Sequence, residues 1–441
     1  MGLQKEIEGQ DVAELGRALH AFAAELYPIC RSITGNGIRQ TLAMIGERIP
    51  LEVHEVATGT PVFDWEVPKE WNIRDAFVKA SNGERIIDFQ QSNLHVMNYS
   101  VPVHAKMELE DLKLHLFSIP QHPDWIPYRT SYYKENWGFC LSHNQLMSLK
   151  DGEYEVCIDS TLEDGKLTYG ECYVPGRSED EVLISCHACH PSLANDNLSS
   201  LTVATLLARY LTGRDLRYSY RFVFAPGTIG AITWLARNQE KAARIRHGLV
   251  LTCIGDSADF HYKKSRRGNA EIDRAMACVL RDLGEAHEML DFSPYGYDER
   301  QYCSPGFNLA VGCLMRSVWG TFPEYHTSAD NLEFIRPEPL AGSLRACAAV
   351  FDVLEANRRY INRSPYCEPQ LGKRNLYDSV GGQSIAQEIN ARLWVLNFSD
   401  GEHSLLDIAE RSGLPFTAIS AAAEVLSDAG LLAVVPADKP C

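Results

Sequence analysis

The sequence predicts an α/β protein with a doubly wound, mostly parallel sheet, a small inserted β domain and a C-terminal winged-helix module. Three observations lead to this prediction. Strand-like and helix-like runs alternate over residues 166–255, residues 59–135 form short runs broken by proline and asparagine, and the chain ends in three short amphipathic helices and an apolar strand. Alternating strands and helices are typical of parallel sheets, and short strands without helices are typical of antiparallel ones.

Composition narrows the classes of function. The chain has 441 residues, of which 45% are hydrophobic and 23% charged, and this describes a globular protein of roughly two or three domains. The net charge of −16 disfavours partners with phosphate backbones or anionic surfaces, so we expect neither nucleic acid nor membrane as a partner. The N-terminus lacks a signal-peptide layout, and the 13 scattered cysteines fit reduced thiols. We therefore expect a cytoplasmic protein.

The first 135 residues contain a helical part followed by a part made of short strands. Residues 11–48 are predicted to be helical with a turn at SITGNG, and LEVHEVA predicts a strand. In the segment that follows, the runs IIDF, LHVMNYSV and LKLHLFSI predict short antiparallel strands. We therefore expect an α/β domain over residues 1–58 and 136–360, interrupted by an inserted β domain over residues 59–135.

The α/β pattern resumes after the insert. The predicted strands KLTYGECYV, EVLISCHA, RYSYRFVFA and HGLVLTCIG alternate with helices at about 197–212 and about 229–245. In doubly wound sheets, binding sites gather at the carboxyl ends of the strands. The run LISCHACHPSLANDNLSS, residues 183–200, lies at such an end and contains two histidines, two cysteines and an aspartate. This run is therefore the first candidate site.

The cysteines and the aspartate of this run have ordinary structural explanations. Cys186 and Cys189 resemble half of a structural zinc site, but a second pair at similar spacing is missing, and they follow a strand and do not begin a helix as a redox pair would. We expect both to be small buried residues. Asn195 or Asp196 precedes an apolar helix and is suited to cap it. A capping aspartate can still bind a metal with its other oxygen.

The C-terminal segment, residues 376–441, is predicted to be a winged-helix module. A DNA-binding module of this type carries Lys or Arg on its second helix, and the corresponding run PFTAISAAAEVLSDAG has none. Residues 381–441 contain eight acidic and three basic residues, a net charge of −5. We expect a role in packing or dimerisation, which would make the protein a homo-oligomer, with regulation through a partner as the alternative.

The order of motifs resembles the M28 family of zinc aminopeptidases, or its aminopeptidase-like relatives with an inserted β domain and a C-terminal winged helix. In that family a histidine ends one strand and a G-A-x-D run precedes a helix, and here His187 and the run LAND ending in Asp196 hold those places. The run YHTSADNLEFI is similar to the family's Y-H-T-x-x-D run and supplies His326. The run YDERQYCSPGFNLAVG resembles a further family segment, with Asp298 in place of its aspartate.

The resemblance, which covers residues 10–58 and 140–358, implies a zinc-exopeptidase-like fold with a catalytic zinc held by His187, Asp196 and His326. Two further ligands are less well matched: Asp256, a few positions after the family's other carboxylate, and His190, which could fill the gap.

The family's Glu-Glu pair, which supplies the general base and a ligand of a second zinc, is replaced here by Gly227 and Thr228. Neither residue can accept a proton from water at neutral pH or bind zinc well. We therefore expect one zinc instead of two.

A hydrolase without the usual glutamate needs other groups near the zinc. The candidates for proton transfer are Asp298, Glu299 and Glu324, and Tyr325 could donate to a developing oxyanion. Arg31 and Arg129 could bind a substrate carboxylate, although an ordinary ion pair would also explain each of them.

Two classes of function remain open at this level. The first is a zinc-dependent hydrolase that cleaves an amide bond of a peptide or a small N-acylated metabolite. The second is a metal-containing binding or scaffold protein that kept the peptidase fold without its chemistry. The loss of the Glu-Glu pair favours the second class, and the retention of His187, Asp196 and His326 favours the first.

Overall fold

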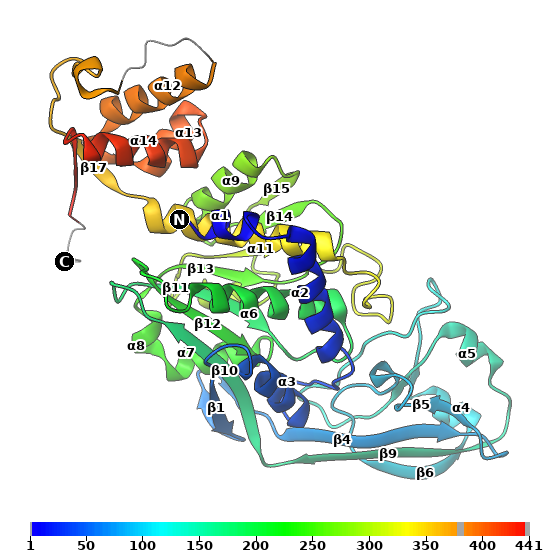
Figure 1. The fold of residues 1–441 in the computed structure, drawn as a ribbon. Coiled ribbons are helices and arrows are strands. Elements are labelled where there is room, and N and C mark those ends of the chain that lie inside the picture. Colours follow the sequence, from blue (N-terminus) through cyan, green and yellow to red (C-terminus); the bar gives the residue numbers. More distant parts are fainter. Residues whose placement is uncertain (1, 377–382, 437–441) are drawn as a thin grey trace. The chain divides into compact units, whose positions relative to one another are not determined.

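The structure is a computed structural model that describes residues 2–376 and 383–436. The chain divides into two compact units: a larger one of residues 5–268 and 288–345, and a smaller one of residues 2–4, 269–287 and the described residues from 346 onward. Each unit is described by itself below (Figure 1). Among the described helices, none combines the length and the apolar character that a membrane crossing requires.

An eight-stranded mixed sheet forms the centre of the larger unit, in the order β1-β10-β12-β11-β13-β16-β14-β15. The four strands β12, β11, β13 and β16 are parallel, whereas β1, β10 and β14 pair antiparallel with their neighbours. The predicted doubly wound sheet is confirmed at this centre, and the outer strands make the sheet mixed. The strands are β1 (Glu52–Ala57), β10 (Lys166–Val174), β11 (Glu181–His187), β12 (Ser219–Ala225), β13 (Ile245–Leu251), β14 (Phe260–Lys263), β15 (His287–Leu290) and β16 (Val311–Met315).

The order in which strands are added to the sheet reverses at β11 and β12, which are parallel neighbours. The connection from β11 to β12 runs through α6, and the connection from β12 back across β11 to β13 runs through α7 and α8. Because both crossovers are right-handed, α6 and α7 lie on opposite faces of the sheet (Figure 1). The carboxyl ends of β11 and β12 therefore lie at a topological switch point, where such folds bind their ligands.

Helices α2, α3, α6, α7 and α8 lie in the ranges predicted to be helical, and α2 packs on α6. Helix α11 passes from the larger unit into the smaller one. The helices are α1 (Leu3–Glu8), α2 (Val12–Leu26), α3 (Asn36–Gly46), α4 (Leu109–Lys113), α5 (His143–Ser148), α6 (Ser199–Leu211), α7 (Ile229–Arg237), α8 (Gln239–Ala242), α10 (Glu299–Tyr302) and α11 (Pro337–Ala356).

The central strands are buried along their whole length. Every residue of β11 and β12 is buried, as expected for parallel strands that are covered on both faces. The charged side chains on them are paired: Arg221 lies 2.5 Å from Glu171 and 2.6 Å from Glu181. These ion pairs compensate the charges that the sheet removes from water.

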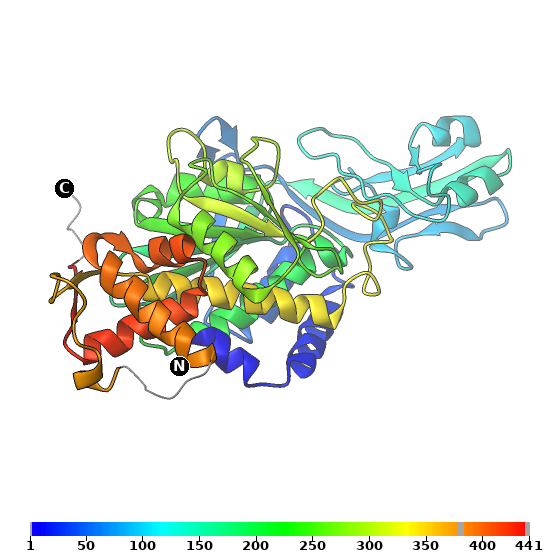
Figure 2. The same ribbon diagram turned by 90° about the horizontal axis from the view of Figure 1, so that it is seen from above.

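The inserted sheet has four antiparallel strands in the order β5-β4-β9-β6. Figures 1 and 2 show it, in blue and cyan, projecting from the eight-stranded sheet. Strand β9 lies beyond residue 135, so this sheet takes strands from both sides of the predicted boundary, and the domain limits remain predictions. The strands of the insert are β2 (Pro61–Val62), β3 (Trp65–Glu66), β4 (Glu70–Lys79), β5 (Arg85–Asp88), β6 (Val103–Glu108), β7 (Leu116–Phe117), β8 (Phe139–Cys140) and β9 (Glu153–Glu163).

Two of the three predicted strand runs in the insert were wrong. IIDF forms β5, but LHVMNYSV begins in a 3₁₀ turn, Asn93–His95, and LKLHLFSI begins in α4 and reaches only the two-residue strand β7. Leu109 and Leu112 are spaced three apart and both are buried. Helical spacing therefore fills this part of the core, although the local sequence alternates as a strand would.

The smaller unit contains the predicted winged-helix module. Its three-stranded sheet has the order β18-β17-β19, and β17 precedes the predicted start of the module at residue 376. Helices α13 and α14 pack on each other and on α9. The elements are α9 (Glu271–Leu283), β17 (Arg359–Asn362), a 3₁₀ turn (Gly372–Arg374), α12 (Gln383–Phe398), β18 (Asp400–Ser404), α13 (Leu405–Ser412), α14 (Phe416–Asp428) and β19 (Leu432–Val434).

Helix α9 packs on α13 and α14, and its Asp282 contacts the first residue of α14. The main-chain N–H of Phe416, at the start of α14, donates to Asp282 Oδ2 at 2.8 Å. Arg274 of α9 forms ion pairs with two acids of α13: its Nη2 lies 2.5 Å from Asp407 Oδ1 and 2.5 Å from Glu410 Oε2. In a DNA-binding helix-turn-helix, the first residues of the second helix contact base edges. Here an acidic side chain of the same chain occupies that end.

We predict that the full-length chain does not bind DNA. Residues 381–441 carry a net charge of −5 and α14 has no basic residue, so phosphate groups are repelled. Gel-shift titrations at low salt should show no retarded species. Saturable binding that weakens steeply as salt is raised would contradict this prediction.

Candidate metal centre

Four side chains converge at the carboxyl end of β11. His187 is the last residue of β11, His190 follows in the next loop, and Asp196 lies in the turn Ala194–Leu198 that leads into α6. Asp196 accepts from two imidazoles, with His187 Nε2 2.7 Å from its Oδ1 and His326 Nε2 3.0 Å from its Oδ2. His187, His190 and Asp196 each offer a ligand atom within 4.8 Å of the others.

A second aspartate fixes the turn that carries Asp196. Asp330 Oδ1 accepts from the main-chain N–H of Asn195 at 2.5 Å, and Oδ2 accepts from the N–H of Asp196 at 3.0 Å. Its main-chain carbonyl accepts from Ala194 at 3.0 Å. Asp330 is the last residue of the YHTSAD run. The run that supplies His326 therefore also fixes the position of Asp196, which His326 contacts. The sequence analysis quoted this residue without giving it a role.

Burial sets the protonation of the cluster. Asp196 is 1% exposed; burial acts to raise its pKa, but the imidazoles of His190 and His187 outweigh this and hold the pKa well below its ordinary value. Burial lowers the pKa of His187 and lowers that of His190 to about 3. Asp196 is therefore an ionised carboxylate beside the neutral imidazoles of His187 and His190, and these are the forms that bind metal ions.

The residues present fit a divalent metal ion. Imidazole nitrogens and one carboxylate form the donor set that zinc takes in catalytic sites. Asn197 Oδ1 is buried beside the cluster and has no hydrogen-bond partner among the described residues, so an unsatisfied acceptor lies next to the ligand atoms. Metal binding would replace the proton that His187 now donates to Asp196. His326 is 34% exposed in its side chain, so the cluster opens to solvent on that side.

Aromatic rings enclose the histidines. Tyr297 stacks on His187 at 3.7 Å between ring centroids, Tyr325 stacks on His326 at 3.9 Å, and Tyr128 meets His190 and His326 edge-on at 5.1 Å. The sequence analysis missed Tyr128 and Tyr297, although each directly precedes a residue that it selected. The runs YRTSYY and YGYDER place tyrosines next to charged residues, and this pattern could have indicated both tyrosines.

The insert reaches this centre through Tyr128. The Tyr128 N–H donates to the His326 carbonyl at 2.8 Å, and Pro127 and Thr327 form an antiparallel bridge. Ile126 and Ser328 exchange two hydrogen bonds, of 2.8 and 3.0 Å. A loop of the insert is thus paired with the loop that carries His326.

The place of the family's Glu-Glu pair lies directly after β12. Thr228 has a positive φ of 59°, and its N–H donates to Asp298 Oδ1 at 2.7 Å. Asp298 is 2% exposed, and burial raises its pKa to about 7. The structure therefore places a carboxyl group near the missing pair, but from a different segment of the chain.

The other residues suggested for proton transfer lie in different surroundings. Glu299 is fully buried and forms an ion pair with Lys263, so its carboxylate is already used. Glu324 is half-buried, and its side chain makes no hydrogen bond or ion pair to a described residue. Burial raises the pKa of Tyr325 well above its ordinary value, so its hydroxyl keeps its proton.

The two selected arginines lie outside the cluster. Arg31 is 1% exposed and donates to the carbonyls of His190 at 2.9 Å and Leu26 at 2.6 Å, and burial lowers its pKa to about 10. Arg129 is exposed and stacks on Phe117, with 4.1 Å from its guanidinium carbon to the ring centre. The substrate-binding roles of both arginines remain predictions.

The structure does not bring Asp256 into the cluster. Asp256 Oδ2 accepts from Asn195 Nδ2 at 2.7 Å and from Ser317 N at 3.3 Å, whereas Oδ1 accepts from Ala258 N at 2.8 Å and Ser317 Oγ at 2.9 Å. Both oxygens are therefore engaged in holding the loop after β13.

The structure also shows whether the two cysteines are buried residues and whether Asp196 caps α6. Cys186 and Cys189 are 1% and 2% exposed, and burial raises the pKa of Cys189 to about 12, so both are buried residues as expected. Neither is in a disulfide. Asp196 does not cap α6, because the capping residue is Leu198 and no side chain caps that end.

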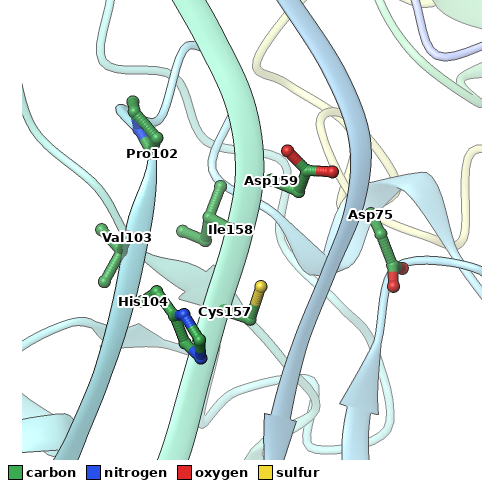
Figure 3. A pocket seen from close by; sticks show the side chains of 7 residues that line it. All are labelled: Asp75, Pro102, Val103, His104, Cys157, Ile158 and Asp159. Carbon is green, nitrogen blue, oxygen red and sulfur yellow. The ribbon is translucent and has the colours of Figure 1, made fainter.

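A separate hollow lies on the inserted sheet (Figure 3). Its two acids are paired, Asp75 with Arg85 at 2.9 Å and Asp159 with Arg74. We assign no chemistry to it. Its lining residues are Asp75, Pro102, Val103, His104, Cys157, Ile158 and Asp159.

Comparison with known proteins gives two family matches. Residues 20–357 match a family described as a domain of unknown function (DUF4910), and residues 358–434 match the winged helix-turn-helix family. A relative from Clostridium acetobutylicum, described as "Putative polysaccharide biosynthesis protein with aminopeptidase-like domain", is 53% identical over 97% of this chain and 98% of its own length.

Solved structures show the same fold. A crystal structure of a "putative peptidase" from Clostridium acetobutylicum has a TM-score of 0.93 and 52% identity, and the match covers 98% of this chain and 100% of that one. A zinc aminopeptidase from Bacillus subtilis has a TM-score of 0.56 at 13% identity, over 77% and 94% of the two chains. A peptidase M28 precursor from Shewanella amazonensis has a TM-score of 0.55 at 13% identity, over 80% and 96%. The larger unit thus has the M28 aminopeptidase fold.

We predict that Asp298 makes stability depend on pH. Its pKa is raised in the folded state from 3.8 to about 7, so its contribution to stability is complete below pH 4 and is lost as the pH rises toward 7. Relative to the variant Asp298→Asn, the wild-type chain should lose up to about 1.4 kcal/mol of unfolding free energy per pH unit in this range. Urea unfolding at several pH values measures the difference.

Asp291→Asn is the matched control, because the Asp291 side chain is 92% exposed. Its stability should follow that of the wild type at each pH. If the Asp298→Asn curve also runs parallel to the wild-type curve, the elevated pKa of Asp298 is wrong.

Proposed function

Because the chain belongs to the DUF4910 family and has the fold of M28 aminopeptidases, we propose that it is a zinc-dependent hydrolase that cleaves an amide bond. The observation that carries this proposal is the convergence of His187, His190 and His326 on the buried carboxylate of Asp196. A purely structural histidine is usually satisfied by one partner. Three imidazoles around one carboxylate, at the carboxyl ends of parallel strands, are better explained by a metal ion.

Each residue of the centre has a separate task in this proposal. His187, Asp196 and His326 would hold the ion, with His190 as the fourth nearby donor. Zinc in such a site supplies Lewis acidity toward a carbonyl or a water molecule. Asp330 keeps the Asp196 turn in place through two main-chain N–H groups. Ligands fixed in this way need little rearrangement when the ion binds.

Glu324 is the proton acceptor that we propose. Its carboxylate has no partner among the described residues, and it lies two positions before His326 along the chain. Asp298, by contrast, is buried and held by the Thr228 N–H. Tyr325 keeps its proton and stacks on His326, so it can donate a hydrogen bond to an oxyanion.

The lost Glu-Glu pair restricts the reaction. With Gly227 and Thr228 in its place, we propose one zinc per chain and weak activity on ordinary aminopeptidase substrates, since removing one general base typically costs about 10²–10⁴-fold in rate. The substrate would be a peptide or a small N-acylated metabolite. The description of the Clostridium relative refers to polysaccharide biosynthesis, and this favours an N-acylated sugar.

We predict about one zinc per chain. Elemental analysis after dialysis should give this value for the wild type, and Asp196→Ala should lose most of the metal, because it removes the carboxylate that two histidines share. His104→Ala, an exposed histidine on the insert, should bind as the wild type does. Two tightly bound zincs in the wild type, or full metal content in Asp196→Ala, would contradict the assigned site.

We predict that Glu324→Gln separates binding from catalysis. Its metal content should stay at the wild-type level while kcat on N-acylated amino sugars or acyl peptides falls about 10²-fold or more. Release of the free amine, followed with and without a chelator, measures the activity. A protein that binds zinc but hydrolyses none of these amides would favour the alternative, a metal-containing binding or scaffold protein.

A further inference from the structure

Tyr297 lies between the first candidate ligand and the place of the missing general base. Its ring stacks on His187 with 3.7 Å between centroids and 29° between planes. Its hydroxyl lies 3.9 Å from Cys189 Sγ. Since the side chain of His187 is fully buried and its Nε2 points at Asp196, the phenol ring covers one face of an imidazole whose edge carries the metal-binding nitrogen.

The space for Tyr297 exists because residue 227 is a glycine. A Cβ atom at position 227 would lie 2.1 Å from Tyr297 Oη, 2.8 Å from Cζ and 2.9 Å from Cε1. These distances are far inside van der Waals contact. Gly227 does not have a positive φ, so the backbone does not require glycine there. The requirement is steric: a side chain at residue 227 and the ring of Tyr297 exclude each other.

Neighbouring contacts fix this arrangement on both sides. The N–H of Gly227 donates to Cys189 Sγ at 3.2 Å, and the N–H of Thr228 donates to Asp298 Oδ1 at 2.7 Å. The Tyr297 N–H donates to the buried Glu299 carboxylate at 3.1 Å. The segment that carries Tyr297 is therefore docked on the loop after β12, with the ring over Gly227 and the next carboxyl group against Thr228.

We propose that Tyr297 is a positioning residue for His187: its ring holds the imidazole in the orientation that binds the metal, and it occupies the space that a side chain at residue 227 would need. This inference rests on the proposed metal site. Groups that orient a metal-binding histidine typically change metal affinity about 10–100-fold when they are removed. The ring, more than the hydroxyl, makes the contact with His187, so the two can be tested separately.

The first test compares Tyr297→Phe with Tyr297→Leu in the full-length chain. Zinc affinity is measured by competition with a chromogenic chelator, and the visible spectrum of the cobalt(II) form reports ligand geometry. Tyr297→Phe should bind zinc about as the wild type does, and Tyr297→Leu should bind about 10-fold more weakly or worse with an altered cobalt spectrum. Tyr295→Leu is the control, because Tyr295 is 72% exposed.

The second test uses the steric exclusion. Gly227→Ala should weaken zinc binding in the wild-type background, because its Cβ displaces the ring, but should add little in the Tyr297→Leu background. Gly306→Ala is the matched control, since a Cβ at Gly306 meets no atom within 4 Å. Tyr297→Leu on its own could lower stability. The cycle still tests the inference, because the variant Tyr297→Leu and the double variant Gly227→Ala/Tyr297→Leu share that loss of stability and are compared with each other.

The outcomes separate this inference from the proposed function. If the wild type binds zinc and Tyr297→Leu binds it equally well with an unchanged cobalt spectrum, the positioning role is wrong and the metal site stands. Additive effects of Gly227→Ala and Tyr297→Leu would also overturn it. If the wild type binds no zinc, the metal site itself is wrong and this inference falls with it.

Discussion

The candidate centre depends on one buried carboxylate. Asp196 is almost completely removed from water and yet ionised, because the imidazoles of His190, His187 and His326 stabilise its charge. Every other feature follows from that requirement. The turn must reach the end of β11, the loop with His326 must fold over it, and α6 must begin without a side-chain cap because its nearest aspartate is engaged elsewhere.

Much of this arrangement could be predicted from the sequence. The alternation of buried strands and helices indicated the central sheet, and the strand-end position of His187 indicated the place of the candidate site. His187, Asp196 and His326 were found because short runs around them match a family pattern, and the structure brings all three together. Local sequence was sufficient to predict these site residues because the position of each is set by its own strand or turn.

Sequence reasoning failed where distant segments share one space. Nothing around Gly227 shows that the ring of Tyr297 fills the volume beside it, because the two residues are brought together only by packing of the loop after β12. Asp256 looked like a ligand by position, but its two oxygens accept four hydrogen bonds, of which three come from the distant residues Asn195 and Ser317 and one from Ala258 in its own loop. Leu112, Leu114 and Leu116 alternate as in a strand, but Leu112 lies in helix α4, where it is buried together with Leu109.

The pairing between Ile126, Pro127 and Tyr128 and the segment 326–328 ties two parts of the chain that are nearly two hundred residues apart. Connecting segments normally tolerate changes in length. This one cannot gain or lose a residue at that point without shifting the register that sets the backbone of His326. A change of length in the insert at this point would therefore also move the loop that carries His326.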